Sequence, residues 1–161
     1  MAEVSNSKLL QIDAGILHTN ACVVIVRTEW NAAIIDELEK GCLRIFEQEG
    51  VKNVKVITVP GAFEIPLLAL RLGQSRKFDA IICLGTIIRG QTPHFDYIAA
   101  EVARGISHAG LTTGVPVVFG IVTADTVDQA LDRAGVKLGN KGFEAAMTAV
   151  ELVNLYKEAF E

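Results

Sequence analysis

The sequence of 161 residues has few aromatic residues, prolines and cysteines, and it contains no long apolar run. A helix that spans a bilayer needs about 20 predominantly apolar residues in succession, so this lack argues against a membrane protein. Residues 1–10 also lack the basic segment and apolar run that are typical of an export signal. We therefore expect a protein that stays in the cytoplasm.

A strong excess of positive charge is missing as well. The formal net charge is -4 at pH 7, and basic residues are neither clustered nor interleaved with aromatic ones. Such a chain has no electrostatic footprint for nucleic acid or for an acidic membrane surface. We expect neither as a partner.

The cysteines, Cys22, Cys42 and Cys83, form no CxxC pair and lie among apolar neighbours. This pattern predicts buried free thiols in a reducing compartment, not metal ligands. The motifs HExxH, GxSxG, GxxxxGKS/T and GxGxxG are absent too, so metalloproteases, serine hydrolases, P-loop proteins and dinucleotide-binding proteins are disfavoured. We expect no metal and no cofactor.

Half of the residues are apolar, and the length suits one domain over residues 1–161, with an N-terminal arm over residues 1–15. Runs rich in β-branched residues predict buried strands at residues 21–26, 54–59, 80–86 and 116–122. Helical apolar spacing predicts helices at residues 34–48, 64–72, 95–109, 127–134 and 142–160. This alternation predicts an α/β fold, a three-layer α/β/α sandwich around a doubly wound, four-stranded parallel sheet with flavodoxin-like strand order. Residues 8–12 are expected to form an additional strand that pairs with a neighbouring subunit.

Open parallel sheets bind ligands beyond the carboxyl ends of their strands, so we look for a site there. After the first strand, Trp30 is the only tryptophan, and its ring could stack on a planar ligand or act as a hydrophobic staple for the next helix. After the second strand, Gly61 is expected to make a tight turn with Glu64 in the first helical turn. This segment could present its amides to a polar substrate, or Glu64 could only complement the helix dipole.

The segment GTIIRGQTPHFDY (residues 85–97) follows the third strand. Thr92 and Pro93 predict the N-cap and the first position of a helix, which puts His94 in the first turn. The free amides of that turn, with Gln91 beside them, would cradle a phosphate or another anion. A histidine at this place could transfer protons near neutral pH, and we favour that role over a structural one.

Three basic residues near these loops have two interpretations each. Arg89 could lend charge to the anion site or form an outward salt bridge. Arg133, near the end of a helix that begins with a capping box at Thr126, could complement the helix dipole or bind an anion. Lys141 lies in a basic turn and is ambiguous in the same way.

Five motifs together resemble the lumazine synthase family: VPGAFEIP at residues 59–66, LGTIIRGQTPHFDY at 84–97, GVPVVFGIVT at 114–123, QALDRAG at 129–135 and GNKGFEAA at 139–146. Their order and spacing match the family over nearly the whole chain. The resemblance implies a transferase that condenses 5-amino-6-(D-ribitylamino)uracil with 3,4-dihydroxy-2-butanone 4-phosphate to 6,7-dimethyl-8-ribityllumazine, the penultimate step of riboflavin biosynthesis. It implies no redox cofactor and no metal.

The same motifs imply a role for individual residues, with His94 as the proton-transfer residue. The pyrimidine would be held by Trp30, Asn31, Ala62, Phe63, Glu64, Thr86, Ile87, Ile88 and Phe119, and the phosphate by Gln91, Thr92, Arg133 and Lys141. In the family, Phe119, Arg133 and Lys141 reach the site from the neighbouring subunit. Gln91 stands where family members vary, so we expect it to contact phosphate through its backbone.

The resemblance also implies a homo-oligomer whose active sites lie between adjacent subunits of a pentamer. The link at residues 134–142 is short, as in members that build icosahedral capsids of 60 subunits, so we expect such a shell, with riboflavin synthase as a candidate partner. Trp30 stands where phenylalanine is commoner, and its larger ring predicts riboflavin binding. Two alternatives remain, a non-catalytic flavin-binding module and a structural shell protein with a vestigial pocket.

Overall fold

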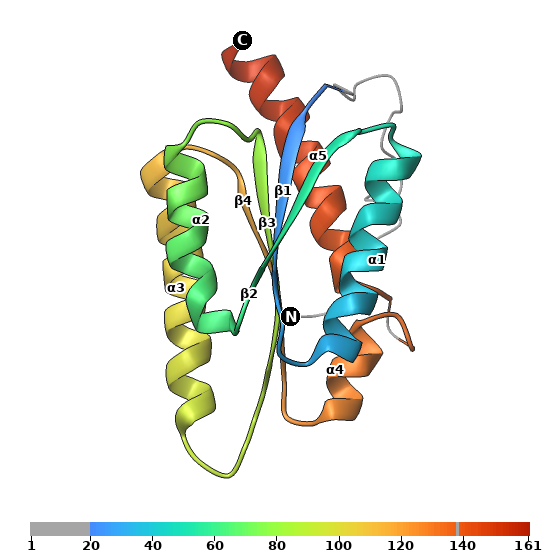
Figure 1. The fold of residues 1–161 in the computed structure, drawn as a ribbon, viewed down its shortest axis with the longest axis vertical. Coiled ribbons are helices and arrows are strands. Elements are labelled where there is room, and N and C mark those ends of the chain that lie inside the picture. Colours follow the sequence, from blue (N-terminus) through green and yellow to red (C-terminus); the bar gives the residue numbers. More distant parts are fainter. Residues whose placement is uncertain (1–19, 138) are drawn as a thin grey trace.

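One sheet lies between two layers of helices in the computed structural model, which describes residues 20–137 and 139–161 (Figure 1). The strands are β1 (Cys22–Thr28), β2 (Asn53–Val59), β3 (Ala80–Ile88) and β4 (Val117–Ala124). All pair in parallel, in the order β2-β1-β3-β4, which confirms the predicted doubly wound sheet. The expected N-terminal arm and its strand at residues 8–12 lie outside the described residues.

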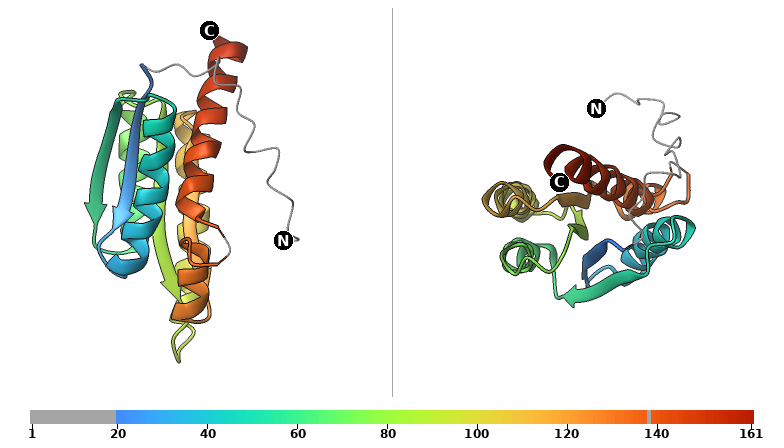
Figure 2. Two further views of the ribbon diagram at one scale, coloured as in Figure 1. Left: turned by 90° about the vertical axis from the view of Figure 1, so that its right-hand side faces the viewer. Right: turned by 90° about the horizontal axis from the view of Figure 1, so that it is seen from above.

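Helices cover both faces of this sheet. One face carries α2 (Ile65–Gln74) and α3 (His94–Thr113), and the other carries α1 (Ala32–Gln48), α5 (Lys141–Phe160) and the short α4 (Val127–Arg133). The view from above in Figure 2 shows the three layers. No helix in the described part of the chain is long and apolar enough to cross a membrane.

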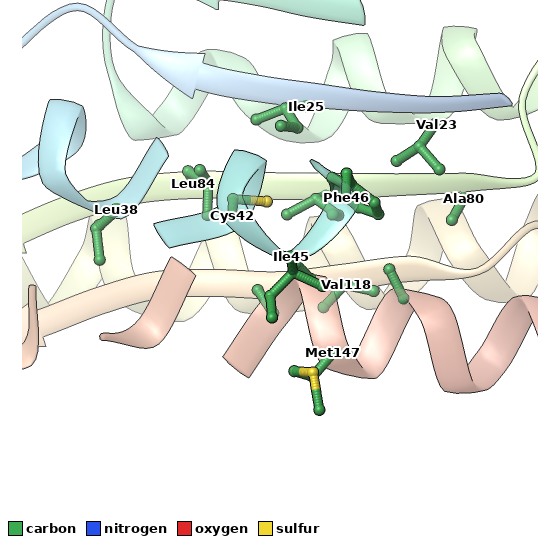
Figure 3. Close-up of a cluster of buried hydrophobic side chains, with 14 of the residues drawn as sticks. Val23, Ile25, Leu38, Cys42, Ile45, Phe46, Ala80, Leu84, Val118 and Met147 are labelled. Atoms are coloured by element: carbon green, nitrogen blue, oxygen red, sulfur yellow. The ribbon is translucent and has the colours of Figure 1, made fainter. Parts of the chain in front are cut away.

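The core is divided by the sheet, because successive side chains of a strand point to opposite faces. Ala80, Ile82 and Leu84 of β3 pack with the cluster under α1 and α5, whereas Ile81 and Cys83 pack with the cluster under α2 and α3. Figure 3 shows the first of these clusters. A large apolar side chain contributes about 1.5–3 kcal/mol when it is fully buried, so both faces stabilise the sheet substantially.

The cysteines differ in their surroundings. Cys42 and Cys83 are free and buried, as predicted, but Cys22 is only partly buried. Burial raises the pKa of the Cys83 thiol to about 12, and it also raises the pKa of Cys42. Both thiols therefore stay protonated near neutral pH and pack as small apolar groups.

The prediction of a buried strand at residues 54–59 is wrong in one respect. β2 is an edge strand, none of its residues is fully buried, and Val56 is 38% exposed. The two helix layers centre on β1 and β3 and leave this edge partly uncovered. A run of β-branched residues cannot by itself distinguish an edge strand from a central one.

Several element boundaries also differ from the prediction. β3 runs to Ile88 and β4 to Ala124, beyond the predicted ends at residues 86 and 122. α3 begins at His94 and continues to Thr113, beyond the predicted end at residue 109. It stops at Gly114, which takes a left-handed conformation with φ 71°.

The link between α4 and α5 is held against α1 by one side chain. Asn140 donates from Nδ2 to the carbonyl oxygens of Glu37 (2.8 Å) and Ala134 (3.1 Å). Its Oδ1 accepts from the N–H groups of Gly142 and Phe143 and so caps α5. This clamp fixes the place where α4 ends and α5 begins.

Candidate active site

A cavity of about 460 Å³ opens at the carboxyl ends of β1 and β3, where the order of the strands reverses. Ligands of doubly wound sheets bind at this point because the loops diverge there. The cavity is lined by Trp30, Ala62, Phe63, Glu64, Thr86, Ile87, Ile88, Gly90, Thr92, His94, Phe95 and Ile98. Most of the residues predicted from the sequence therefore meet in one place.

Trp30 forms one wall of this cavity. Its side chain is 65% exposed, and the benzene part of its indole lies next to Gly61. A hydrophobic staple would pack its ring on the following helix. The exposed ring at the cavity wall favours the stacking interpretation.

Gly61 begins a short 3₁₀ helix, η2 (Ala62–Glu64), that leads into α2. Its N–H donates to Oε2 of Glu64 at 3.0 Å. The chain bends at Pro60 and Gly61, as expected, but the φ of -135° and ψ of 177° at Gly61 are extended values that do not require glycine. Phe63 and Glu64 are both exposed beside the cavity.

Thr86 lies in the floor of the cavity, within β3. It is 7% exposed, and its Oγ1 has no hydrogen-bond partner among the described residues. Its carbonyl oxygen accepts a long hydrogen bond, 3.5 Å, from Nδ2 of Asn31. Asn31 has a left-handed backbone with φ 62°, and its side chain joins the ends of β1 and β3 beside the cavity.

The start of α3 forms the opposite wall. His94 is the first helical residue and is exposed, and its N–H donates to Oγ1 of Thr92 at 3.5 Å. The N-cap position is Pro93, one residue later than predicted. Gln91 is exposed outside the residues that line the cavity, so any contact it makes with a phosphate is at the rim.

Arg89 holds the loop between β3 and α3. Its guanidinium donates to Asp125 (2.9 Å) and to Asp96 (3.2 and 3.3 Å), and it lies 4.2 Å from the centre of the Phe95 ring. The hydrogen bonds with Asp96 and Asp125 raise the pKa of Arg89. Of its two interpretations, the structure favours the outward salt bridge.

Phe95 and Ile98 line the cavity but were not predicted from the sequence. The spacing of His94 and Ile98, four residues apart on one helix, could have indicated Ile98 once the helix start was known. Phe95 follows His94 in the sequence. That position alone does not show whether its side chain lines the cavity or packs in the core.

Three predicted residues lie elsewhere in the described chain. Phe119, on the edge strand β4, and Lys141, at the start of α5, line a second hollow of about 480 Å³. Arg133 is exposed at the end of α4 and lines neither space. A single chain therefore does not bring these three residues to His94.

Fold and cavity together define a class, the doubly wound α/β proteins that bind a small polar or planar molecule at the switch point of the sheet. The described residues contain no group of three His, Cys, Asp or Glu side chains that could hold a metal ion. Comparison with family models matches residues 20–157 to 6,7-dimethyl-8-ribityllumazine synthase. The chain belongs to the 6,7-dimethyl-8-ribityllumazine synthase family, whose members are transferases of riboflavin biosynthesis that act on small molecules.

Proposed function

We propose that this chain condenses 5-amino-6-(D-ribitylamino)uracil with 3,4-dihydroxy-2-butanone 4-phosphate to form 6,7-dimethyl-8-ribityllumazine. One observation carries the proposal: a cavity at the switch point of the sheet joins an exposed aromatic ring, Trp30, to a histidine at a helix start, His94. Membership of the family supports the same activity. The cavity volume of about 460 Å³ lies in the range of small-molecule sites.

The pyrimidine would stack on Trp30 and turn its polar groups toward the loop around η2 and the end of β3. Main-chain groups of Ala62 and Phe63 and the carboxylate of Glu64 would bind the uracil edge and the ribityl chain. The hydroxyl of Thr86 has no partner among the described residues, which supports a ligand hydrogen bond here, because a buried hydroxyl without a partner costs free energy. Ile87 and Ile88 would form the apolar floor.

The chemistry begins when the 5-amino group attacks the ketone and water leaves, which gives an imine. Elimination then expels phosphate, and the 6-ribitylamino nitrogen closes the ring on the new carbonyl with loss of a second water. Each step moves protons between nitrogen, carbon and oxygen atoms. His94, exposed at the cavity wall, would shuttle these protons, because an imidazole ring can both accept and donate a proton.

The phosphate would lie at the N-terminus of α3, near Thr92 and the backbone of Gln91. Arg133 would neutralise it from a neighbouring subunit, with Lys141 close by and Phe119 closing the pyrimidine site. The separation of these three residues from His94 within one chain supports a site that two subunits share. We propose a cyclic pentamer, and a 60-subunit shell because the link after α4 is short.

The first test follows lumazine absorbance with both substrates and the assembled protein. We expect His94→Ala to lower kcat by about a hundredfold, the scale of general acid–base catalysis. His108→Ala is the matched control, because His108 is exposed on the same helix, does not line the cavity, and pairs with the hydroxyl of Thr112. Wild-type protein that does not exceed the spontaneous rate would contradict the proposal, as would a His94→Ala variant of unchanged rate.

A flavin-binding module without turnover is the second candidate, and the exposed ring of Trp30 favours it. Riboflavin should quench the emission of this single tryptophan, and Trp30→Ala should weaken flavin binding about tenfold, because the stacking surface is lost. A protein that only binds flavin would show this quenching and its loss in Trp30→Ala. In such a protein, His94→Ala would leave the flavin affinity unchanged, and neither variant nor wild type would accelerate lumazine formation. Absence of quenching in the wild-type protein would remove this candidate.

A further inference from the structure

Gly61 and Trp30 compete for the same space at the cavity wall. A Cβ atom added to Gly61 would lie 2.6 Å from Cε3 and Cζ3 of Trp30 and 3.1 Å from Oε2 of Glu64. Real Cβ atoms essentially never lie closer than 3.0 Å to a heavy atom of a residue that is not their neighbour in the chain. The indole ring therefore occupies the volume that any side chain at position 61 would need.

The backbone of Gly61 does not itself require glycine. Its φ of -135° and ψ of 177° are extended values that every residue adopts. Gly114 shows the contrast, because its φ is 71° and an added Cβ would meet nothing within 4 Å. At Gly114 the backbone requires glycine, whereas at Gly61 the requirement is the room for the Trp30 ring.

Backbone hydrogen bonds hold the loop that carries Trp30 against the loop that carries Gly61. The N–H of Trp30 donates to the carbonyl oxygen of Pro60 at 3.1 Å, and that of Glu29 donates to Val59 at 2.8 Å. These bonds join the loop after β1 to the loop after β2. Asn31, the next residue, has a left-handed backbone with φ 62°, and its side chain donates to the carbonyl oxygen of Thr86.

We propose that Gly61 is a positioning residue, which seats the Trp30 ring by lacking a side chain and so sets how far the ring reaches into the cavity. The contribution of this ring position to pyrimidine binding rests on the proposed function. The packing of the Trp30 ring against Gly61 does not depend on that function. Substitution by alanine displaces the ring, because the two loops are tied together and cannot separate to make room.

The packing of the Trp30 ring can be tested without an activity assay, because Trp30 is the only tryptophan and its fluorescence is not overlaid by that of another. Time-resolved anisotropy of its emission, in the assembled protein, reports its local motion. We expect Gly61→Ala to add a fast component that the wild-type protein lacks. Gly110→Ala is the matched control, because a Cβ atom there would meet its nearest neighbour at an ordinary 3.6 Å.

Kinetics then test the functional consequence. We expect Gly61→Ala to raise KM for the pyrimidine about tenfold and to change kcat by a smaller factor. The Trp30 ring contributes to substrate binding and takes no part in proton transfer. In the Trp30→Ala background the same substitution should change KM by less than about twofold, because no ring remains to displace. If Gly61→Ala lowers the yield of assembled protein, recovery of that yield by Trp30→Ala supports the same conclusion.

Unchanged anisotropy in Gly61→Ala would overturn the proposal. An equal rise of KM in both backgrounds would also overturn it, and would point to the contact with Glu64 instead. If the wild-type protein does not accelerate lumazine formation, the proposed function fails, and the anisotropy still decides whether Gly61 seats the ring.

Discussion

Thr86 is buried in the cavity floor with a hydroxyl that has no partner in the described chain. Leaving such a group unsatisfied costs about 1–3 kcal/mol of stability. Valine has nearly the same shape and carries no group that needs a partner. Valine at position 86 should therefore make the ligand-free protein more stable than threonine does. Such a sacrifice of stability is expected of a residue whose hydrogen-bond partner is a ligand.

We predict that Thr86→Val raises the free energy of unfolding of the ligand-free protein by about 1 kcal/mol and raises KM for the pyrimidine. Urea unfolding and steady-state kinetics measure the two effects. Thr113→Val is the matched control with the opposite sign, because Thr113 is buried with its hydroxyl bonded to Ala109 and Val115. A Thr86→Val protein that is less stable, with an unchanged KM, would refute a ligand role for this hydroxyl.

At the scale of elements, Arg89 connects the end of β3, the start of α3 and the loop after β4. It does so through Asp96, Asp125 and the face of Phe95. Arg89, Asp96 and Asp125 are exposed, so their ion pairs add little to global stability. Their effect is local, because the loop they hold carries Thr92 and leads into His94.

We predict that Arg89→Ala lowers kcat/KM about tenfold and changes the unfolding free energy by less than about 1 kcal/mol. Arg104→Ala removes another exposed ion pair of α3, that with Glu101, and should change neither quantity appreciably. Lumazine formation and urea unfolding of both variants provide the comparison. Equal activity losses in the two variants would show that Arg89 has no special position.

The elements that the sequence predicts well are those whose pattern is set by the core. β3 is buried along nearly its whole length, and its run of apolar residues identified it directly. The edge position of β2 was not predictable, because it depends on which strands the helices cover. The packing of the Trp30 ring against Gly61 was not predicted either. The two residues lie in different loops, which come together only because β1 pairs with β2.

At the scale of the whole molecule, the predicted site falls into two parts. His94 lies at the cavity, whereas Arg133 lies at the end of α4 and Phe119 beside α5. From the sequence, the family motifs predict all of these residues together. In the structure of one chain, however, Arg133 and Phe119 lie away from His94. Sequence motifs show which residues belong to a site, but they do not show which subunit supplies each residue.

We predict that mixed oligomers of His94→Ala and Arg133→Ala subunits are more active than oligomers of either variant alone. If each site combines His94 of one subunit with Arg133 of the next, equal mixing leaves about a quarter of the sites intact. Dissociating, mixing and reassembling the two variants, followed by the lumazine assay, measures the recovery. Activity that stays at the level of the separate variants would place both residues in one subunit's site or exclude Arg133 from it.

The described sheet ends in two open strands, β2 on one side and β4 on the other. Each presents main-chain N–H and C=O groups that another extended segment can pair with. If the chain assembles as proposed, neighbouring subunits and unrelated unfolded chains would compete for these edges in a newly synthesised subunit. Slower synthesis or a lower temperature should favour soluble product over inclusion bodies, because fewer partly folded chains are then present at once.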